Sequence, residues 1–108
     1  MNNAYIGIDL GTSGCRSIAI DQQDNIIASS QHSLETTQAV SPKSEQDPHT
    51  HWQVVEQVLT ELIPRLQHYE IKSIAVDATS GSILIADQHG KPLTPIIMYS
   101  DSRAIENR

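Results

Sequence analysis

One short segment near the start of the chain combines an acidic side chain with a turn of small residues. Asp9 ends an apolar run, and Gly11, Thr12, Ser13 and Gly14 follow it closely. Small residues let a backbone approach a ligand, and successive N–H groups in such a turn can form an anion-binding site. An acid beside this loop repels phosphate unless a cation lies between them. The segment therefore indicates Mg²⁺ at Asp9 and phosphoryl oxygens on the loop.

Arg16 lies just beyond the loop and can make a charge-assisted contact with a phosphate. The same spacing is also common in plain hairpin turns, in which Asp caps the turn and glycines take left-handed conformations. The spacing alone leaves both interpretations open. The Gly-Lys-Ser/Thr ending of a Walker loop is missing.

Apolar runs separated by turn residues predict the strands that position this loop. The expected strands cover residues 5–10, 15–20, 26–34, 71–76, 83–86 and 96–98. Tight turns between the first three imply antiparallel pairing, with residues 26–34 at an edge. The polar segment 35–46 is expected to be a loop, and residues 100–108 the start of a further helix.

A helix is expected to begin at Asp47 and Pro48, because Asp is favoured as an N-cap and Pro in the first turn. Pro64 is expected to end or kink it. Its predicted apolar face consists of Trp52, Val55, Leu59, Leu62 and Leu66. Trp52 is expected to anchor this face on the sheet. A helical crossover favours a parallel strand after it, so the sequence predicts an α/β fold with a mixed sheet.

Charge and composition narrow the classes of function. The chain has 108 residues, a formal net charge of −6 and no cluster of Lys and Arg, which argues against nucleic acid as a partner. The single cysteine, Cys15, permits no internal disulfide and fits a reducing compartment. No apolar stretch approaches the ~18 residues of a membrane span, and no signal peptide is recognised. We therefore expect a cytoplasmic protein without a membrane partner.

Four segments, in order along the chain, resemble one protein family. Residues 6–14 resemble the first phosphate motif of the sugar kinase, actin and chaperone superfamily, which has a ribonuclease H-like fold. The other three resemble segments of the FGGY carbohydrate kinases. These are an acidic-Pro-Trp helix start at residues 44–52, a strand pair at residues 75–93, and a Trp-x-Asp-x-Arg segment at residues 98–104.

The resemblance implies an actin-like ATPase with two domains, of which residues 1–108 form the first part of the first domain. It implies transfer of the ATP γ-phosphoryl group to a sugar hydroxyl, with ATP and Mg²⁺ as cofactors. By motif, Asp9 matches the metal-organising acid, and residues 11–14 with Arg16 match the phosphate contacts. The positions that border the sugar in the family correspond to Thr79, Ser80, Asp101 and Arg103.

The resemblance also bears on the substrate and on activity. The segments around Thr79 and Asp101 look closest to the pentulose kinases (ribulokinase and xylulokinase), which implies ribulose or xylulose as acceptor. Ala78 stands where Gly is common in the family, and Tyr99 where Trp is common. The family's catalytic base and adenine pocket lie beyond Arg108. We therefore expect no catalytic residue here and no kinase activity from these 108 residues alone.

Two hypotheses of other classes stay open. A metal-dependent nuclease of the same fold would place carboxylates at the ends of adjacent strands, as Asp9 and Asp77 could be, but the negative charge disfavours it. A non-catalytic module could form a homodimer that covers an exposed face. His49 and His51, with no third ligand nearby, are more typical of a solvated helix end than of a metal site.

Overall fold

Four strands form the main sheet, in the order β3-β2-β1-β6. The structure is a computed structural model that describes residues 1–34, 38–40 and 43–98. The strands are β1 (Asn2–Leu10), β2 (Gly14–Ile20), β3 (Ile26–Ser33) and β6 (Tyr69–Ala78). The first three pair antiparallel, whereas β6 pairs parallel with β1. The predicted mixed sheet, with residues 26–33 at one edge, is confirmed.

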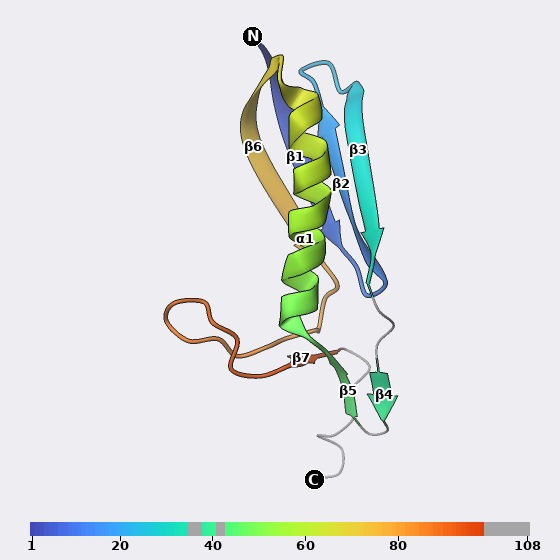
Figure 1. The fold of residues 1–108 in the computed structure, drawn as a ribbon, viewed down its shortest axis with the longest axis vertical. Coiled ribbons are helices and arrows are strands. Elements are labelled where there is room, and N and C mark those ends of the chain that lie inside the picture. The colour runs from blue at the N-terminus through green and yellow to red at the C-terminus, as the bar shows by residue number, and fades with distance from the viewer. Residues whose placement is uncertain (35–37, 41–42, 99–108) are drawn as a thin grey trace.

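The helix α1 (Pro48–Leu62) lies across one face of this sheet (Figure 1). Its start follows the predicted signals, because Asp47 Oδ1 accepts a hydrogen bond from His49 N–H at 2.9 Å and Pro48 occupies the first turn. The helix ends at Leu62 and continues as the short 3₁₀ helix η1 (Ile63–Leu66), which contains Pro64. Pro64 thus ends the α-helix as predicted.

Side-chain alternation along β1 and β2 decides which face of the sheet the helix covers. Every second residue of each strand is buried beneath α1, and the residues between them face the other way. The core is formed by Ile6, Ile8, Cys15, Ala19, Leu34, Val54, Val58, Leu62 and Leu66. Cys15 is fully buried and packs as a small apolar residue of this core.

The predicted apolar face is confirmed for Val55, Leu59, Leu62 and Leu66, which are buried or packed against the core, but not for Trp52. Val54, Val58 and Leu62 are buried, whereas Trp52 is 62% exposed and does not anchor the helix. A helix turns by about 100° per residue, so Trp52 lies about 200° from Val54, on the opposite side. The predicted face that includes Trp52 and the buried stripe Val54, Val58 and Leu62 both repeat every three or four residues, so the spacing alone could not show which of the two is more deeply buried.

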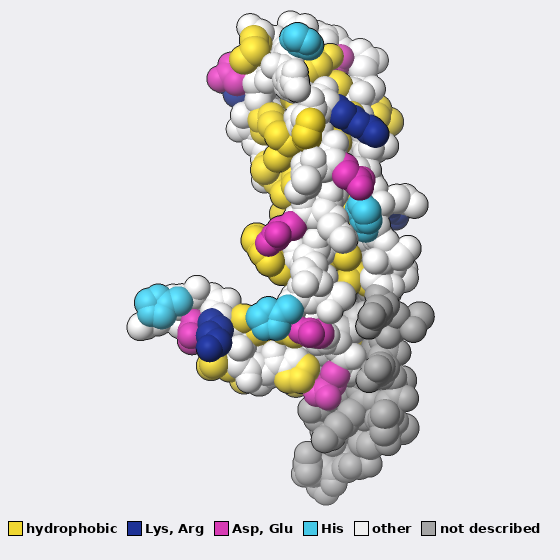
Figure 2. All heavy atoms as spheres, viewed as in Figure 1, with side chains coloured by type: hydrophobic (Ala, Val, Ile, Leu, Met, Phe, Trp, Pro, Cys, Tyr) yellow, Lys and Arg dark blue, Asp and Glu magenta, His cyan; other side chains and the backbone are white. Residues whose placement is uncertain are grey.

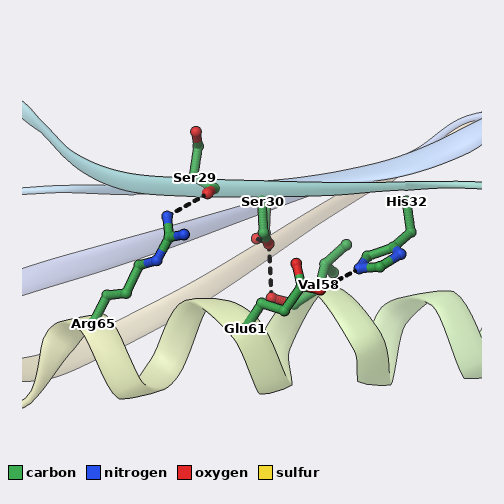
Figure 3. A network of polar contacts seen from close by, with 7 residues as sticks. Ser29, Ser30, His32, Val58, Glu61 and Arg65 are labelled. Atoms are coloured by element: carbon green, nitrogen blue, oxygen red, sulfur yellow. Dashed lines mark hydrogen bonds and ion pairs between the residues drawn. The ribbon is translucent and has the colours of Figure 1, made fainter.

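Polar contacts fix α1 against β3 (Figure 3). Ser30 Oγ donates to the Val58 carbonyl at 2.7 Å, and Arg65 Nη1 donates to the Ser29 carbonyl at 3.1 Å. His32 Nε2 lies 2.7 Å from Glu61 Oε1. Two of these contacts join α1 and the third joins η1 to the same edge strand, which fixes the helical segment on the β3 side of the sheet.

The opposite edge strand, β6, is left largely uncovered by the helix. Ile74 and Val76 are in register with the buried Ile6 and Ile8, yet they are 50% and 64% exposed. Hydrophobic side chains are accordingly visible along the side of the molecule on which β6 lies (Figure 2). The structure therefore has one sheet edge with apolar side chains open to solvent.

A second, small sheet lies beyond the end of the main one and corrects two predictions. It contains β4 (Gln38–Val40), β5 (Lys43–Gln46) and β7 (Ile96–Ile97), although the polar segment 35–46 was expected to be a loop. Backbone pairing forms β4 and β5 without the apolar pattern of a strand, whereas β7 falls within the strand predicted at residues 96–98. Residues 83–86 form no strand, only the isolated bridges Ile83–Ile97 and Ala86–Pro92. Three of the four residues carry exposed apolar side chains, Ile83, Leu84 and Ile85.

Candidate functional site

The predicted phosphate loop, residues 11–14, joins β1 to β2 at the end of the sheet where β6 ends and α1 begins (Figure 1). Gly11 N–H donates to the Gly14 carbonyl at 2.9 Å and closes the turn. Neither glycine has a positive φ, in contrast to a hairpin turn built on left-handed glycines. Gly14 is instead required by space, because a Cβ there would lie 2.8 Å from the His32 carbonyl oxygen.

The carbonyl groups of the loop are held by the protein. The Thr12 carbonyl accepts from Gln46 Nε2 at 2.9 Å, and the Ser13 carbonyl accepts from Leu34 N–H at 2.9 Å. A trans peptide directs its N–H opposite to its C=O, so the Ser13 N–H points away from Gln46. Within residues 1–34, 38–40 and 43–98, neither Thr12 N–H nor Ser13 N–H donates a hydrogen bond. These two amides can therefore donate to an anion.

Asp9 and Arg16 lie opposite each other on β1 and β2, beside the loop. Arg16 Nη2 is 3.3 Å from Asp9 Oδ2. Both side chains are well exposed, so the pair contributes little to stability and both groups can reach a ligand. The acid and the base that the sequence singled out are thus brought together with the loop.

Asp77 is the neighbour of Asp9 across the parallel β1–β6 pair. The hydrogen bond with Asp77, followed by the influence of Arg16, holds the pKa of Asp9 below its ordinary value. The same hydrogen bond, together with the charge of Asp9, raises the pKa of Asp77. Asp9 is therefore the ionised member that can hold a cation, and the two carboxyls titrate as a pair.

The donor set at Asp9 fits Mg²⁺ rather than a metal that needs a full protein cage. Among the described residues no group of three or more His, Cys, Asp and Glu gathers around one point, and this includes the surroundings of His49 and His51. Mg²⁺ typically takes one or two carboxylates and completes its shell with water and substrate phosphates. Asp9 beside the phosphate loop offers such a carboxylate, while Arg16 offers a positive charge to a phosphoryl oxygen.

A small, mostly apolar cavity of about 110 Å³ lies on the α1 side of the loop. Gly11, Thr12, His51 and Thr79 are among the residues that line it. Thr79 is fixed there because its N–H donates to the Leu10 carbonyl at 3.3 Å. The predicted sugar-contacting Thr79 therefore does lie next to the loop, whereas Ser80 is exposed in the following turn. Asp101 and Arg103 lie outside the described residues.

Sequence reasoning missed two residues at this site. Gln46 is nearly buried and bonds the loop, and His51 bonds Gln46 and lines the cavity. Both stand in the acidic-Pro-Trp segment, so the motif contained the signal. The assignment of residues 35–46 to a loop and of His51 to a solvated helix end concealed it.

A second, wider hollow of about 730 Å³ lies on the sheet face that α1 leaves open. Asp9, Arg16 and Asp77 stand in it together with Gly7 and Ile18. On the face that Figure 2 shows, Lys and Arg side chains are scattered and form no basic patch. No described helix is long and apolar enough to cross a membrane.

Comparison with known proteins identifies the class to which this fold and site belong. Residues 4–107 match the N-terminal domain of the FGGY family of carbohydrate kinases, and the chain therefore belongs to that family. The fold agrees, since the structure superposes with a TM-score of 0.88 on a Plasmodium falciparum glycerol kinase solved with ADP. That likeness, at 25% identity, covers 98% of this chain and 22% of the other.

Curated relatives share the sequence at moderate identity. An apulose kinase of Pectobacterium atrosepticum is 33% identical over 92% of this chain and 20% of its own length. A xylulose kinase of Staphylococcus epidermidis is 34% identical over 95% of this chain and 21% of its own length. The chain thus spans about a fifth of the length of these relatives.

Proposed function

We propose that this chain supplies the phosphate- and metal-binding corner of an ATP-dependent kinase that transfers the γ-phosphoryl group to a sugar hydroxyl. The observation that carries the proposal is the arrangement around the loop. Two amides are available to an anion, an ionised Asp9 stands beside them for Mg²⁺, and Arg16 adds a positive charge. Phosphoryl transfer depends on such positioning and charge stabilisation.

Each group has a separate part in this proposal. The Thr12 and Ser13 amides hold phosphoryl oxygens, and Asp9 holds Mg²⁺ directly or through water. Mg²⁺, when bound, would neutralise the charge that develops on the phosphates. Arg16 orients a phosphoryl oxygen, and Thr79, Ser80, Asp101 and Arg103 border the sugar. The proton of the sugar hydroxyl is taken by a base outside these 108 residues, and the adenine is held outside them too.

The acceptor that we propose is a pentulose such as xylulose or ribulose. Support comes from the relatives, which include several xylulose kinases at 26–34% identity. Thr79 beside the small cavity also offers a hydroxyl where a sugar could dock. A solved glycerol kinase and a gluconate kinase share the fold, so the fold itself does not choose among acceptors.

The experiment is a coupled ATP assay on the longest natural chain that contains residues 1–108, with xylulose, ribulose, glycerol and gluconate as acceptors. We expect Mg²⁺-dependent turnover with a ketopentose and at least ten times less with the other two. Turnover with glycerol or gluconate alone would contradict the pentulose assignment. Absence of turnover with every acceptor, from a folded protein, would contradict the kinase proposal.

We further propose that residues 1–108 alone do not turn over ATP. The purified 108-residue chain in the same assay, at high concentration, provides the test. Sugar-dependent ADP release above the level of an Asp9→Asn control would refute this part.

One observation favours the nuclease hypothesis, namely the adjacency of Asp9 and Asp77 at the ends of parallel strands. Family membership and the scattered basic side chains favour the kinase instead. Incubation of the chain with Mg²⁺ and an RNA–DNA hybrid discriminates the two, and we expect no cleavage. A homodimer, the third hypothesis, would cover the open β6 edge.

A further inference from the structure

Two hydrogen bonds in series connect the first turn of α1 to the phosphate loop. His51 Nε2 lies 2.6 Å from Gln46 Oε1, and Gln46 Nε2 lies 2.9 Å from the Thr12 carbonyl oxygen. Gln46 is only 9% exposed, so water competes little for these bonds. The buried Gln46 amide thus links His51 on α1 to the backbone of the loop, and the donor and acceptor of each hydrogen bond can be assigned.

The protons in this series can be assigned from the acceptor at its end. The Thr12 carbonyl can only accept, so the Gln46 atom that faces it must be the amide nitrogen. The Gln46 oxygen then faces His51 and must accept, which requires a proton on His51 Nε2. Burial is the main cause that lowers the pKa of His51, so its ring favours the neutral form with the single proton on Nε2.

We propose that His51, acting through Gln46, is a positioning residue for the phosphate loop, which it fixes so that Ser13 N–H faces a phosphoryl oxygen. The inference rests on the proposed function in that the loop takes phosphate. The Thr12 carbonyl fixes which end of the Gln46 amide faces the loop, and the His51 Nε2–H matches that same orientation by donating to the Gln46 oxygen. His51 thereby adds a second contact that stabilises the Gln46 amide in the orientation that holds the loop.

The contacts of His51 and of the loop carbonyls explain why the loss of His51 would change one peptide of the loop and leave the rest of the turn in place. His51 lines the same small cavity as Gly11 and Thr12, which places it beside the loop. The Ser13 carbonyl is held separately by Leu34 N–H, and the Gly14 carbonyl by Gly11 N–H. Loss of the Gln46 contact therefore frees the peptide between Thr12 and Ser13 while the turn itself persists.

A first measurement uses the unmodified chain and needs no ligand. Nitrogen-15 NMR of the imidazole ring reports which nitrogen of His51 carries the proton. We expect the Nε2–H form in the wild-type chain and a mixture of both neutral forms in Gln46→Met, which has a similar shape but neither accepts nor donates. A wild-type ring protonated only on Nδ1 would overturn the inference.

A second measurement titrates pyrophosphate with Mg²⁺ into the labelled chain and follows the Ser13 amide signal. Gln46→Met and His51→Phe are each expected to weaken binding by roughly two- to tenfold, the effect of one neutral hydrogen bond. His51→Gln keeps a donor of similar reach and is expected to restore most of the affinity. His49→Phe, an exposed site two residues away, is the matched control and should change nothing.

The outcomes separate this inference from the kinase proposal. Unchanged affinity in both Gln46→Met and His51→Phe overturns the positioning role, whatever the turnover assay gives. Failure of pyrophosphate to shift Ser13 in the wild-type chain overturns it too, while the kinase proposal stands or falls on turnover alone. If Gln46→Met does not fold, the contrast between His51→Phe and His51→Gln decides.

Discussion

Single side chains decide whether the corner of this molecule can hold an anion. Asp9 and Asp77 are neighbours on adjacent parallel strands, and the interaction between them lowers the pKa of Asp9 and raises that of Asp77. A site that takes up both a cation and phosphate needs one ionised acid, because two would add repulsion. The pairing on adjacent parallel strands provides this asymmetry without a buried group.

The raised pKa of Asp77 predicts a dependence of stability on pH. The folded chain binds the Asp77 proton more tightly than the unfolded chain, so stability falls as the pH rises from the ordinary value of about 4 through the raised one. Asp77→Asn keeps an N–H donor beside Asp9 but has no proton to lose, so its stability does not fall as the pH rises through the raised pKa of Asp77. We expect the variant to be more stable than the wild type near neutral pH, and the difference to shrink towards pH 4.

Urea unfolding at several pH values measures this difference, with the exposed Glu56→Gln as control. A difference that grows towards low pH would contradict the assignment of the raised pKa to Asp77.

Gly14 provides a second prediction at this scale. A Cβ at Gly14 would lie 2.8 Å from the His32 carbonyl oxygen, whereas one at Gly11 would meet the nearest atom at 3.4 Å. Gly14→Ala must displace backbone and is expected to lower the free energy of unfolding by about 1–3 kcal/mol. Gly11→Ala should cost clearly less. Equal losses in the two variants, measured by urea unfolding, would show that space is not the cause.

At the scale of elements, α1 is held by a buried stripe and by contacts to one edge strand. Leu62 is fully buried, and Leu62→Ala is expected to cost about 2–5 kcal/mol. Trp52→Ala is expected to cost no more than about 0.5 kcal/mol, because its side chain is mostly exposed. Thermal unfolding of both variants tests the observed stripe against the predicted one, in which Trp52 is the anchor.

The elements that could be predicted from sequence are those with a local cause. Asp47 specifies the helix start through its side-chain hydrogen bond to His49 N–H, and Pro48 does so through its fixed backbone angle. In the polar turn before β3, the Asp21 carboxylate accepts from Asn25 N–H. Residues 83–86 have strand-like composition but no neighbouring strand to pair with over their length. β4 and β5, in contrast, lack a strand-like composition and form strands because their backbones find pairing partners.

The same distinction applies to the site. Asp9, Arg16 and residues 11–14 are adjacent in sequence, and a local motif could identify them. Gln46 and His51 reach the loop only because the crossover brings the start of α1 to the end of β1 (Figure 1). Their part in the site depends on tertiary structure, which local spacing does not contain.

At the scale of the whole molecule, the structure is elongated, with extents of 57 × 27 × 20 Å. Its radius of gyration of 16.6 Å exceeds the roughly 13 Å of a compact domain of this length. The projecting small sheet and the uncovered β6 both enlarge the surface. Open edge strands with apolar side chains favour pairing with another chain.

We therefore expect the 108-residue chain to self-associate through β6. Ile74→Lys places a charge on this edge and is expected to shift the chain towards monomer, whereas Leu93→Lys, exposed in a loop, should not. Sedimentation velocity over a range of concentrations measures both. A wild-type chain that stays monomeric throughout would argue against a homodimer.

The hydrogen bonds that hold the loop carbonyls also have a consequence for biosynthesis. The carbonyl of Leu10, just before the loop, accepts from Thr79 N–H. The Thr12 carbonyl accepts from Gln46 and the Ser13 carbonyl from Leu34, so the loop is held by residues that are translated after it. A ribosome that has released only the first hairpin has made the residues of the loop but none of these three supports. An anion that binds the loop as we propose cannot assist the earliest steps of folding, because the loop is fully supported only when β6 has emerged and docked beside β1.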